Sequence, residues 1–377
     1  MILKGKFNTA KVFTDNIEQA CVEQIENLLN MEAFADTTIR IMPDCHAGKG
    51  CTIGFTMDIK DKVVPNLVGV DIGCGMLTVN LEKSKEEIDF SKLDEVINKF
   101  VPSGFNVREK PFGSAKVWVE THNQYALGIP DDKVDYVARS IGTLGGGNHF
   151  IEVAESQQTK ECYLIIHSGS RYLGVHVCNY WQAWAKLNFR HERNIPKEVI
   201  PDELCWLEGS DLKGYLRDMQ VCWAYAQYNR EAIATNIIDN MGWTSEISPL
   251  EYFHTVHNYI GNDNTIRKGA ISAKKGETLL IPLNMRDGSL LCIGKSNPDW
   301  NYSAPHGAGR VLSRKQAKKR LSLDEFKKEM EGIYTTSVCE KTLDEAPEAY
   351  KEGIEELIGD TVKVIDRLKT VYNFKAK

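Results

Sequence analysis

Apolar residues recur at intervals of three and four along several segments of the chain, a spacing typical of amphipathic helices. This spacing predicts helices over residues 15–30, 85–100, 180–191, 211–240, 313–320 and 344–359. Asp15 is the expected N-cap of the first helix, because a side-chain oxygen there can accept a hydrogen bond from the first turn. Residues 101–140 show no clear pattern.

Short apolar runs and alternating segments predict the strands, at residues 38–42, 63–70, 77–81 and 162–166. The first strand is expected to stop at Pro43. Residues 261–304 alternate around Lys275-Gly276 and Asp287-Gly288, which predicts β-hairpins, and the chain alternates again after residue 359. Strands mixed with helices favour an α+β fold with mixed or antiparallel sheets.

The composition is that of a soluble globular protein, with 42% hydrophobic and 26% charged residues among 377. The formal net charge of −6 argues against a protein that coats nucleic acid through bulk charge. The sequence contains no internal repeat and no Pro/Ser-rich linker, and its motifs extend from residue 44 to residue 306. We therefore expect one domain over residues 1–377, built around one site.

Ten cysteines are present, but their spacing follows no disulfide framework. The chain opens without a secretory apolar segment, and no run approaches 18 apolar residues. These features predict a cytoplasmic protein with mostly free thiols and no membrane association.

The segment 68–76, VGVDIGCGM, places Asp71 and Cys74 three residues apart among glycines. Glycine frees the backbone, so both side chains could turn toward one metal ion. The same segment also fits a strand end followed by a tight turn, with Cys74 buried as a small apolar residue.

Four histidines, at 149, 167, 257 and 306, each end an apolar or glycine-rich run. A single histidine in this setting is more often structural, and His122, His176 and His191 are assigned that role. Together with Asp71 and Cys74, the four favour a mixed oxygen, nitrogen and sulfur metal site. Ligand softness alone favours zinc, although a thiolate can also bridge two metals.

Three glycine-rich segments, GTLGGGN, HSGSR and HGAGR, favour binding of phosphate groups, because their backbone amides can converge on an anion. Arg171 and Arg310 follow two of them and could clamp a phosphate. No G-x-x-x-x-G-K-[ST] run exists, which excludes a P-loop nucleoside triphosphatase. The basic helix 313–320 fits either a solvated face or a nucleic-acid contact.

These segments together resemble the RtcB family of GTP- and manganese-dependent RNA ligases. The matching motifs, in family order from residue 42 to the C-terminal region, are MPDCHAGKGCTIG, GVDIGCGM, GGGNHFIE, IIHSGSR, VHN, RKGA, SAPHGAGR and DEAPEAYK. The resemblance implies a single-domain fold around two manganese ions. Cys74 would bridge the ions, with Asp71 and His149 completing one and His167 and His257 the other.

The resemblance also implies that His306 is the nucleophile that accepts GMP, with Asp44 near the metals. Phosphate groups would be handled by Lys268, Arg171 and Arg310. Residues implied to contact GTP are Asn148, Glu152, Asn284, Ser289, His306, Gly307, Gly309, Tyr350 and Lys375. The chain departs from the family in its loop PLNMRDG, residues 282–288, where Asn284 replaces a serine, and in its last two residues.

The implied reaction joins an RNA 3′-phosphate or 2′,3′-cyclic phosphate to a 5′-hydroxyl through an RNA–ppG intermediate, in RNA repair or tRNA splicing. The alternatives are a metal-dependent RNA phosphoesterase or cyclic phosphodiesterase, and a scaffold that binds RNA without catalysis. The short chain resembles a compact subgroup with a release-factor-like protein partner, and we expect a monomer. Residues expected to line the RNA groove are Arg267, Lys268, Lys274, Lys275 and 313–320.

Overall fold

Most of the helices predicted from apolar spacing are present, but several of them begin or end at other residues, and the one predicted over 344–359 is not continuous. The computed structural model describes residues 1–48, 50–243 and 252–376, so Lys49 of the segment 42–54 lies outside the described residues. The α-helices are α1 (Gln19–Leu29), α2 (Phe90–Phe100), α3 (Ala115–Tyr125), α4 (Asp131–Ser140), α5 (Arg171–Leu187), α6 (Gly209–Met241), α7 (Arg314–Arg320), α8 (Leu323–Glu329) and α9 (Ile354–Ile358).

The first residues of several helices differ from those predicted. The N-cap of α1 is Glu18 rather than Asp15, whereas Asp89 caps α2 by accepting a hydrogen bond from the Lys92 amide at 3.0 Å. Helix α5 begins at Arg171, well before the predicted residue 180. The helix predicted over 344–359 is broken at Pro347 into 3₁₀ turns and α9.

The strands form two main sheets. The six-stranded sheet has the order β1 (Ile2–Lys4), β2 (Thr9–Val12), β3 (Ile39–His46), β4 (Ile53–Asp58), β12 (Thr265–Lys268) and β11 (Asn258–Ile260). The seven-stranded sheet has the order β10 (Tyr252–Val256), β6 (Gly75–Asn80), β8 (Cys162–Ser168), β7 (Phe150–Ser156), β17 (Val362–Lys375), β15 (Gly288–Gly294) and β14 (Thr278–Asn284). Two ribbons pair β13 (Ala270–Ser272) with β16 (Ser303–Pro305), and β5 (Lys62–Val63) with β9 (Leu207–Glu208).

Strands β2 and β3 pair in parallel, whereas the other paired strands in the described part of the chain are antiparallel. The fold is therefore a mixture of helices with largely antiparallel sheets, which confirms the α+β prediction. The hairpin at Asp287-Gly288 is confirmed by the pairing of β14 with β15. The turn at Lys275-Gly276 closes no hairpin, because β13 pairs with β16 instead.

Two predicted strands end at other residues than expected, and a proline lies at each of these positions. Strand β3 continues through Pro43 to His46. Its pairing with β4 is irregular between Ile41 and His46, so the backbone N–H that proline lacks is not needed for a hydrogen bond between the strands there. The strand predicted over residues 63–70 ends at once, since Pro65 opens a 3₁₀ turn, Pro65–Leu67.

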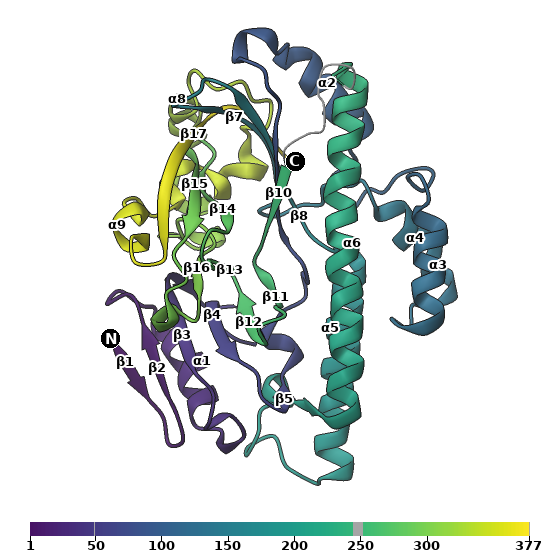
Figure 1. Cartoon of the computed structure of the whole chain (residues 1–377), viewed down its shortest axis with the longest axis vertical. Coiled ribbons are helices and arrows are strands. Elements are labelled where there is room, and N and C mark those ends of the chain that lie inside the picture. The colour runs from purple at the N-terminus through teal and green to yellow at the C-terminus, as the bar shows by residue number, and fades with distance from the viewer. Residues whose placement is uncertain (49, 244–251, 377) are drawn as a thin grey trace.

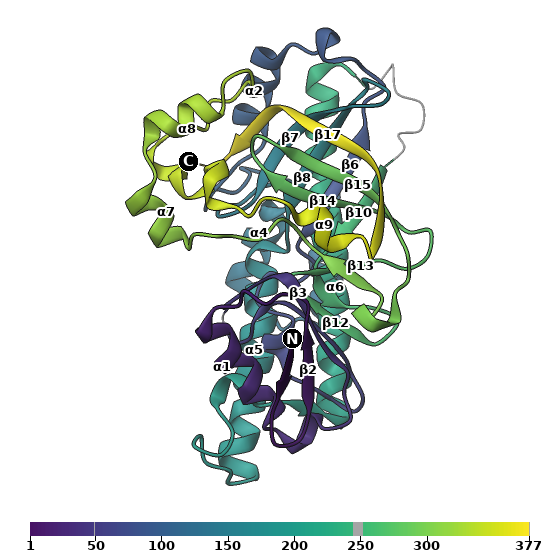
Figure 2. The ribbon, with the colours of Figure 1, turned by 90° about the vertical axis from the view of Figure 1, so that its left-hand side faces the viewer.

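Helix α6 runs along both sheets, with α5 beside it (Figure 1). The six-stranded sheet and the seven-stranded sheet lie at opposite ends of the long axis (Figure 2). Leu212 and Tyr225 of α6 belong to the apolar core beside the smaller sheet, and Ile233 and Ile237 to the core beside the larger one. One helix thus fixes the two sheets relative to each other. In the described ranges, no helix combines the length and apolar character needed to cross a membrane.

Candidate active site

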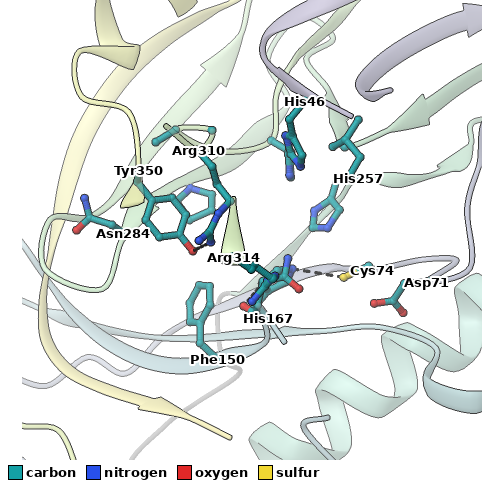
Figure 3. A pocket seen from close by; sticks show the side chains of 18 of the residues that line it. His46, Asp71, Cys74, Phe150, His167, His257, Asn284, Arg310, Arg314 and Tyr350 are labelled. Carbon is teal, nitrogen blue, oxygen red and sulfur yellow. Dashed lines mark hydrogen bonds between the residues drawn. The ribbon is translucent and has the colours of Figure 1, made fainter. Parts of the chain in front are cut away.

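A cavity of about 690 Å³ is lined by residues from both main sheets. Its walls come from the segment 66–74, from β7, β8, the start of β11 and the end of β12, and from the loops around residues 284 and 306. Figure 3 shows side chains from these segments, among them Cys74, His167, His257 and Tyr350, around one space. The motifs that are scattered along the sequence therefore meet at one place.

The loop before β6 presents Asp71 and Cys74 to this cavity. Gly73 has φ +72°, and a Cβ atom there would lie 2.9 Å from the Cα of Trp223 in α6. Only glycine allows both this conformation and this close approach. The Cys74 amide donates to the Asp71 carbonyl at 3.1 Å, so a tight turn holds the two side chains together.

Five side chains form two triads that share one sulfur atom. Cys74 groups with His167 and His257, and it also groups with Asp71 and His149. The Cys74 Sγ atom lies 3.4 Å from His167 Nε2 and 3.5 Å from His149 Nε2. In each triad the donor atoms lie within 4.8 Å of one another, which is close enough for one metal ion to contact all three.

The orientation of the rings suits metal binding. His149 Nδ1 donates to the Leu144 carbonyl at 2.9 Å, and His167 Nδ1 donates to the Asn148 carbonyl at 3.2 Å. Each Nε2 atom is then left facing Cys74, and His149 Nε2 is also 3.0 Å from the Asp71 carboxylate. Backbone acceptors that fix the outer nitrogen in this way are usual for histidine ligands of metals.

The charges of the cluster also favour a cation. Burial, with further contributions from neighbouring histidines, lowers the pKa of His167 and of His257 well below the usual value, so both rings are neutral. Burial raises the pKa of Asp71, but the hydrogen bond and charge of His149, together with Cys74 and Arg171, outweigh it and lower the value to about 2. Among the described residues, the buried Nδ1 atom of His257 has no hydrogen-bond partner.

His306 lies beside this cluster, paired with Asp44. The centroids of the His306 and His257 rings are 5.0 Å apart. His306 Nδ1 donates to the Asp44 carboxylate at 2.7 Å, and the His306 amide donates to the same oxygen at 3.2 Å. Asp44 is fully buried, whereas the His306 ring lines the cavity. With the proton on Nδ1, the Nε2 lone pair is available for attack.

A second polar cluster surrounds Glu345, behind Tyr350 of the cavity wall. The Tyr350 hydroxyl donates to Glu345 at 2.8 Å and accepts from Arg310 at 3.1 Å. Lys375 and Arg314 also form ion pairs with the Glu345 carboxylate. Burial raises the pKa of Glu345, but Lys375 and the two arginines outweigh it and lower the value to about 2.

Glu152 lies in the cavity wall and is almost completely buried. Burial raises its pKa to about 8, although Asn373 Nδ2 donates to one carboxylate oxygen at 3.0 Å. The carboxyl group is therefore neutral in the folded chain at neutral pH and charged in the unfolded chain. This difference makes folding stability depend on pH.

Replacement of Glu152 by glutamine is expected to raise the melting temperature at pH 9 by about 3 °C and to change little at pH 4. The raised pKa contributes stability below pH 4.5, which is lost as the pH rises through about 8. Thermal melts of both proteins from pH 4 to pH 9 measure this. Equal slopes of melting temperature against pH would contradict the neutral carboxyl.

Of the other residues implied in nucleotide or phosphate binding, most line the cavity and two do not. Those that line the cavity are Asn148, Lys268, Asn284, Gly307, Gly309, Arg310, Tyr350 and Lys375. The Asn284 side chain is engaged within its own loop, accepting from the Arg286 and Asp287 amides at 2.9 Å each. Ser289 does not line the cavity, and its buried hydroxyl has no partner in the described residues.

Arg171 also does not line the cavity. Its Nε atom donates to Thr143 Oγ1 at 3.2 Å, and Nη2 donates to the Gly104 carbonyl at 2.9 Å. Gly145 has φ +84°, which favours glycine there, and a Cβ atom at this position would also displace the guanidinium, 1.8 Å away. In this arrangement Arg171 supports the loop before His149 and adds positive charge behind Asp71.

Some of the basic residues expected to line an RNA groove lie in the cavity wall, and others do not. Arg267 is 1% exposed and paired with Asp263, which places it in the core rather than in a groove. Lys274 pairs with the same carboxylate, and neither it nor Lys275 lines the cavity. The helix predicted at 313–320 is α7, and its first residues Arg314 and Lys315 reach the cavity wall.

His46 and Glu345 were not predicted as site residues. His46 lines the cavity, and its Nδ1 donates to the Asp44 carbonyl at 3.1 Å. Both residues stand inside quoted motifs, MPDCHAGKGCTIG and DEAPEAYK. The motifs were the available signal, but the sequence does not show which of their side chains turn inward.

Comparison with known proteins agrees with this geometry. A family model described as tRNA-splicing ligase RtcB matches residues 24–376. The RNA-splicing ligase RtcB of Escherichia coli K12 is 30% identical over 94% of each chain. The tRNA-splicing ligase RtcB of Archaeoglobus fulgidus is 27% identical over 97% of this chain and 91% of its own. The family match and the identity over nearly the whole length show that this chain belongs to the RtcB family.

Proposed function

We propose that the protein is a GTP- and manganese-dependent RNA ligase that joins 3′-phosphate or 2′,3′-cyclic phosphate ends to 5′-hydroxyl ends. The observation that carries the proposal is the pairing of His306 with Asp44 beside the two donor triads in one cavity. A nucleophile, the group that orients it and a cation site are the parts that transfer of a nucleotide requires. The names of the relatives support RNA as the substrate.

In the proposed first step, His306 Nε2 attacks the α-phosphorus of GTP, a P–N bond forms and pyrophosphate leaves. Asp44 holds the Nδ1 proton and stabilises the positive charge that the ring acquires. Where the RNA ends in a 2′,3′-cyclic phosphate, water would first open the ring to a 3′-phosphate and a 2′-hydroxyl. GMP then passes from His306 to the RNA 3′-phosphate, and the 5′-hydroxyl attacks the resulting RNA–ppG end as GMP departs. Lys268 and Arg310, in the cavity wall, would contact the phosphates.

Asp71, Cys74, His149, His167 and His257 would hold two manganese ions, with Cys74 shared. The ions would supply positive charge to the phosphate oxygens during transfer. The observed donors fit this role, because two imidazoles face a shared sulfur and their outer nitrogens are fixed by backbone carbonyls. The donors also fit zinc, so binding and adduct formation should be compared with manganese, zinc, cobalt and magnesium.

Tyr350, Glu152 and Lys375 would form the nucleotide pocket, since they line the cavity on the side of the Glu345 cluster. A phosphoesterase would not need these groups or a covalent histidine. The test supplies labelled GTP and an RNA with a 2′,3′-cyclic phosphate to the wild-type protein. Ring opening without a protein–GMP adduct would replace the ligase proposal by the hydrolase alternative.

Replacement of Asp44 by asparagine is expected to slow GMP transfer to the protein about 100-fold or more, because the ring loses its negative partner and its fixed tautomer. The rate of adduct formation at saturating GTP measures this. Metal affinity should not change, since Asp44 belongs to neither triad. Asp61→Asn, at an exposed loop, is the matched control. A wild-type rate in the Asp44 variant would remove Asp44 from the proposal.

A further inference from the structure

Arg230 is a buried cation that the proposed reaction does not use. It lies in α6 and is 0% exposed. Within the described residues, no carboxylate lies at ion-pair distance from its guanidinium, and Nη2 has no hydrogen-bond partner. Burial lowers its pKa to about 10, so it stays charged at neutral pH. Burial of a charge without a carboxylate partner costs folding free energy, which points to a specific role for Arg230.

The contacts of Arg230 are with the backbone that carries the donor triads. Its Nη1 atom donates to the Gly73 carbonyl at 2.8 Å and to the Ser168 carbonyl at 2.8 Å. Gly73 immediately precedes Cys74, and Ser168 immediately follows His167. One nitrogen atom thus joins the two chain segments whose donor atoms lie 3.4 Å apart.

The neighbour of Arg230 on its other side is neutral. Arg230 Nε donates to His254 Nδ1 at 3.4 Å, and His254 Nε2 faces Glu231 at 3.2 Å. Burial, with a further contribution from Arg230, lowers the pKa of His254 to about 3. The ring therefore accepts from Arg230 without competing as a cation, and it fixes the plane of the guanidinium.

We propose that Arg230 is a positioning residue of the metal site: its guanidinium ties the backbones beside Cys74 and His167 to α6 and so sets the separation of the two donor atoms. This inference rests on the metal site of the proposed function. Groups that orient metal ligands commonly change metal affinity by 10- to 100-fold when they are replaced. Arg230 would do so through the backbone and without touching a ligand side chain.

The test measures Co²⁺ binding to the full-length protein by its visible absorption and its near-ultraviolet thiolate-to-cobalt band. We expect Arg230→Met to bind Co²⁺ at least tenfold more weakly, with a reduced thiolate band. We expect Arg230→Lys to bind at least threefold more weakly with a shifted band, because an ammonium keeps the charge but lacks the planar fork. Circular dichroism and thermal melts establish that each variant folds.

Arg190→Met is the matched control. Arg190 also donates to two backbone carbonyls, those of Ile195 and Ile200 at 2.6 and 2.7 Å, but it lies outside the cavity. Its replacement should lower stability and leave the cobalt spectrum unchanged. If Arg230→Met does not fold, Arg230→Lys alone decides. A wild-type affinity and spectrum in Arg230→Lys would overturn the inference. Cobalt binding is read without GTP, so a failed adduct assay in wild-type protein would overturn the ligase proposal and not this one.

Discussion

Replacement of His306 by alanine is expected to abolish the covalent protein–GMP adduct, with a loss of at least about 1,000-fold in the rate of its formation. Among the described histidines that line the cavity, His306 alone combines an Nδ1 atom held by a carboxylate with an Nε2 lone pair left for attack. His167 turns its Nε2 atom toward Cys74, the Nδ1 atom of His257 has no partner in the described residues, and His46 Nδ1 donates to a carbonyl. Incubation with α-labelled GTP and Mn²⁺, followed by denaturing gel electrophoresis, measures the adduct.

The adduct should be labile in acid, as expected for a P–N bond, which distinguishes it from a phosphoester on serine or threonine. His306→Ala should still bind metal, because His306 belongs to neither triad. The matched control is His122→Ala, in α3, whose ring donates to the Trp118 carbonyl and does not line the cavity. An adduct that persists in His306→Ala would show a different nucleophile, and its absence from metal-loaded wild-type protein would refute the ligase proposal.

The donors of the triads could be predicted from sequence because each stands at a local break in the chain. Asp71 and Cys74 lie in a glycine turn, and His167 stands near the end of β8. Such positions present side chains whatever the rest of the fold does. The family resemblance then grouped the five residues, and the structure brings the same five together.

The neighbours of these residues could not be predicted in this way, because they come from distant parts of the chain. Asp44 and His306 are 262 positions apart, and Arg230 reaches Gly73 across 157. The sequence also does not show that Asn284 bonds within its own loop, nor that Arg171 points behind the cavity. Side-chain direction depends on packing, which local patterns do not record.

In the fold, too, some elements could be predicted from the sequence and others could not. Helix α6 is long and buries side chains along its whole length, from Leu212 to Met241, and it was predicted to within about two residues. Helices α3 and α4 fall in residues 101–140, where no pattern was evident, and α3 buries only Ala115 and Val119. Their position depends on contacts with the rest of the protein, such as the bond from Tyr225 to the Val137 carbonyl at 2.7 Å. Short helices with few buried side chains are difficult to predict from sequence.

Replacement of Cys74 by alanine is expected to weaken binding of both metal ions, by at least about tenfold each, because both triads contain its sulfur. Loss of His257 alone should affect mainly one ion, since it belongs to one triad. Isothermal titration calorimetry with Mn²⁺, together with metal analysis of the dialysed protein, distinguishes weaker binding of both ions from weaker binding of one. The adduct with GTP should be lost in Cys74→Ala together with the metal.

The control for loss of a buried thiol is Cys292→Ala, in β15, which is fully buried among apolar residues away from the triads. It should lower stability slightly and leave two ions bound. The shared sulfur makes the expected pattern specific: a Cys74 variant that retains one ion at full affinity would show a terminal ligand rather than a bridge. Full occupancy by two ions would remove Cys74 from the metal site and leave the imidazoles and Asp71 as its donors.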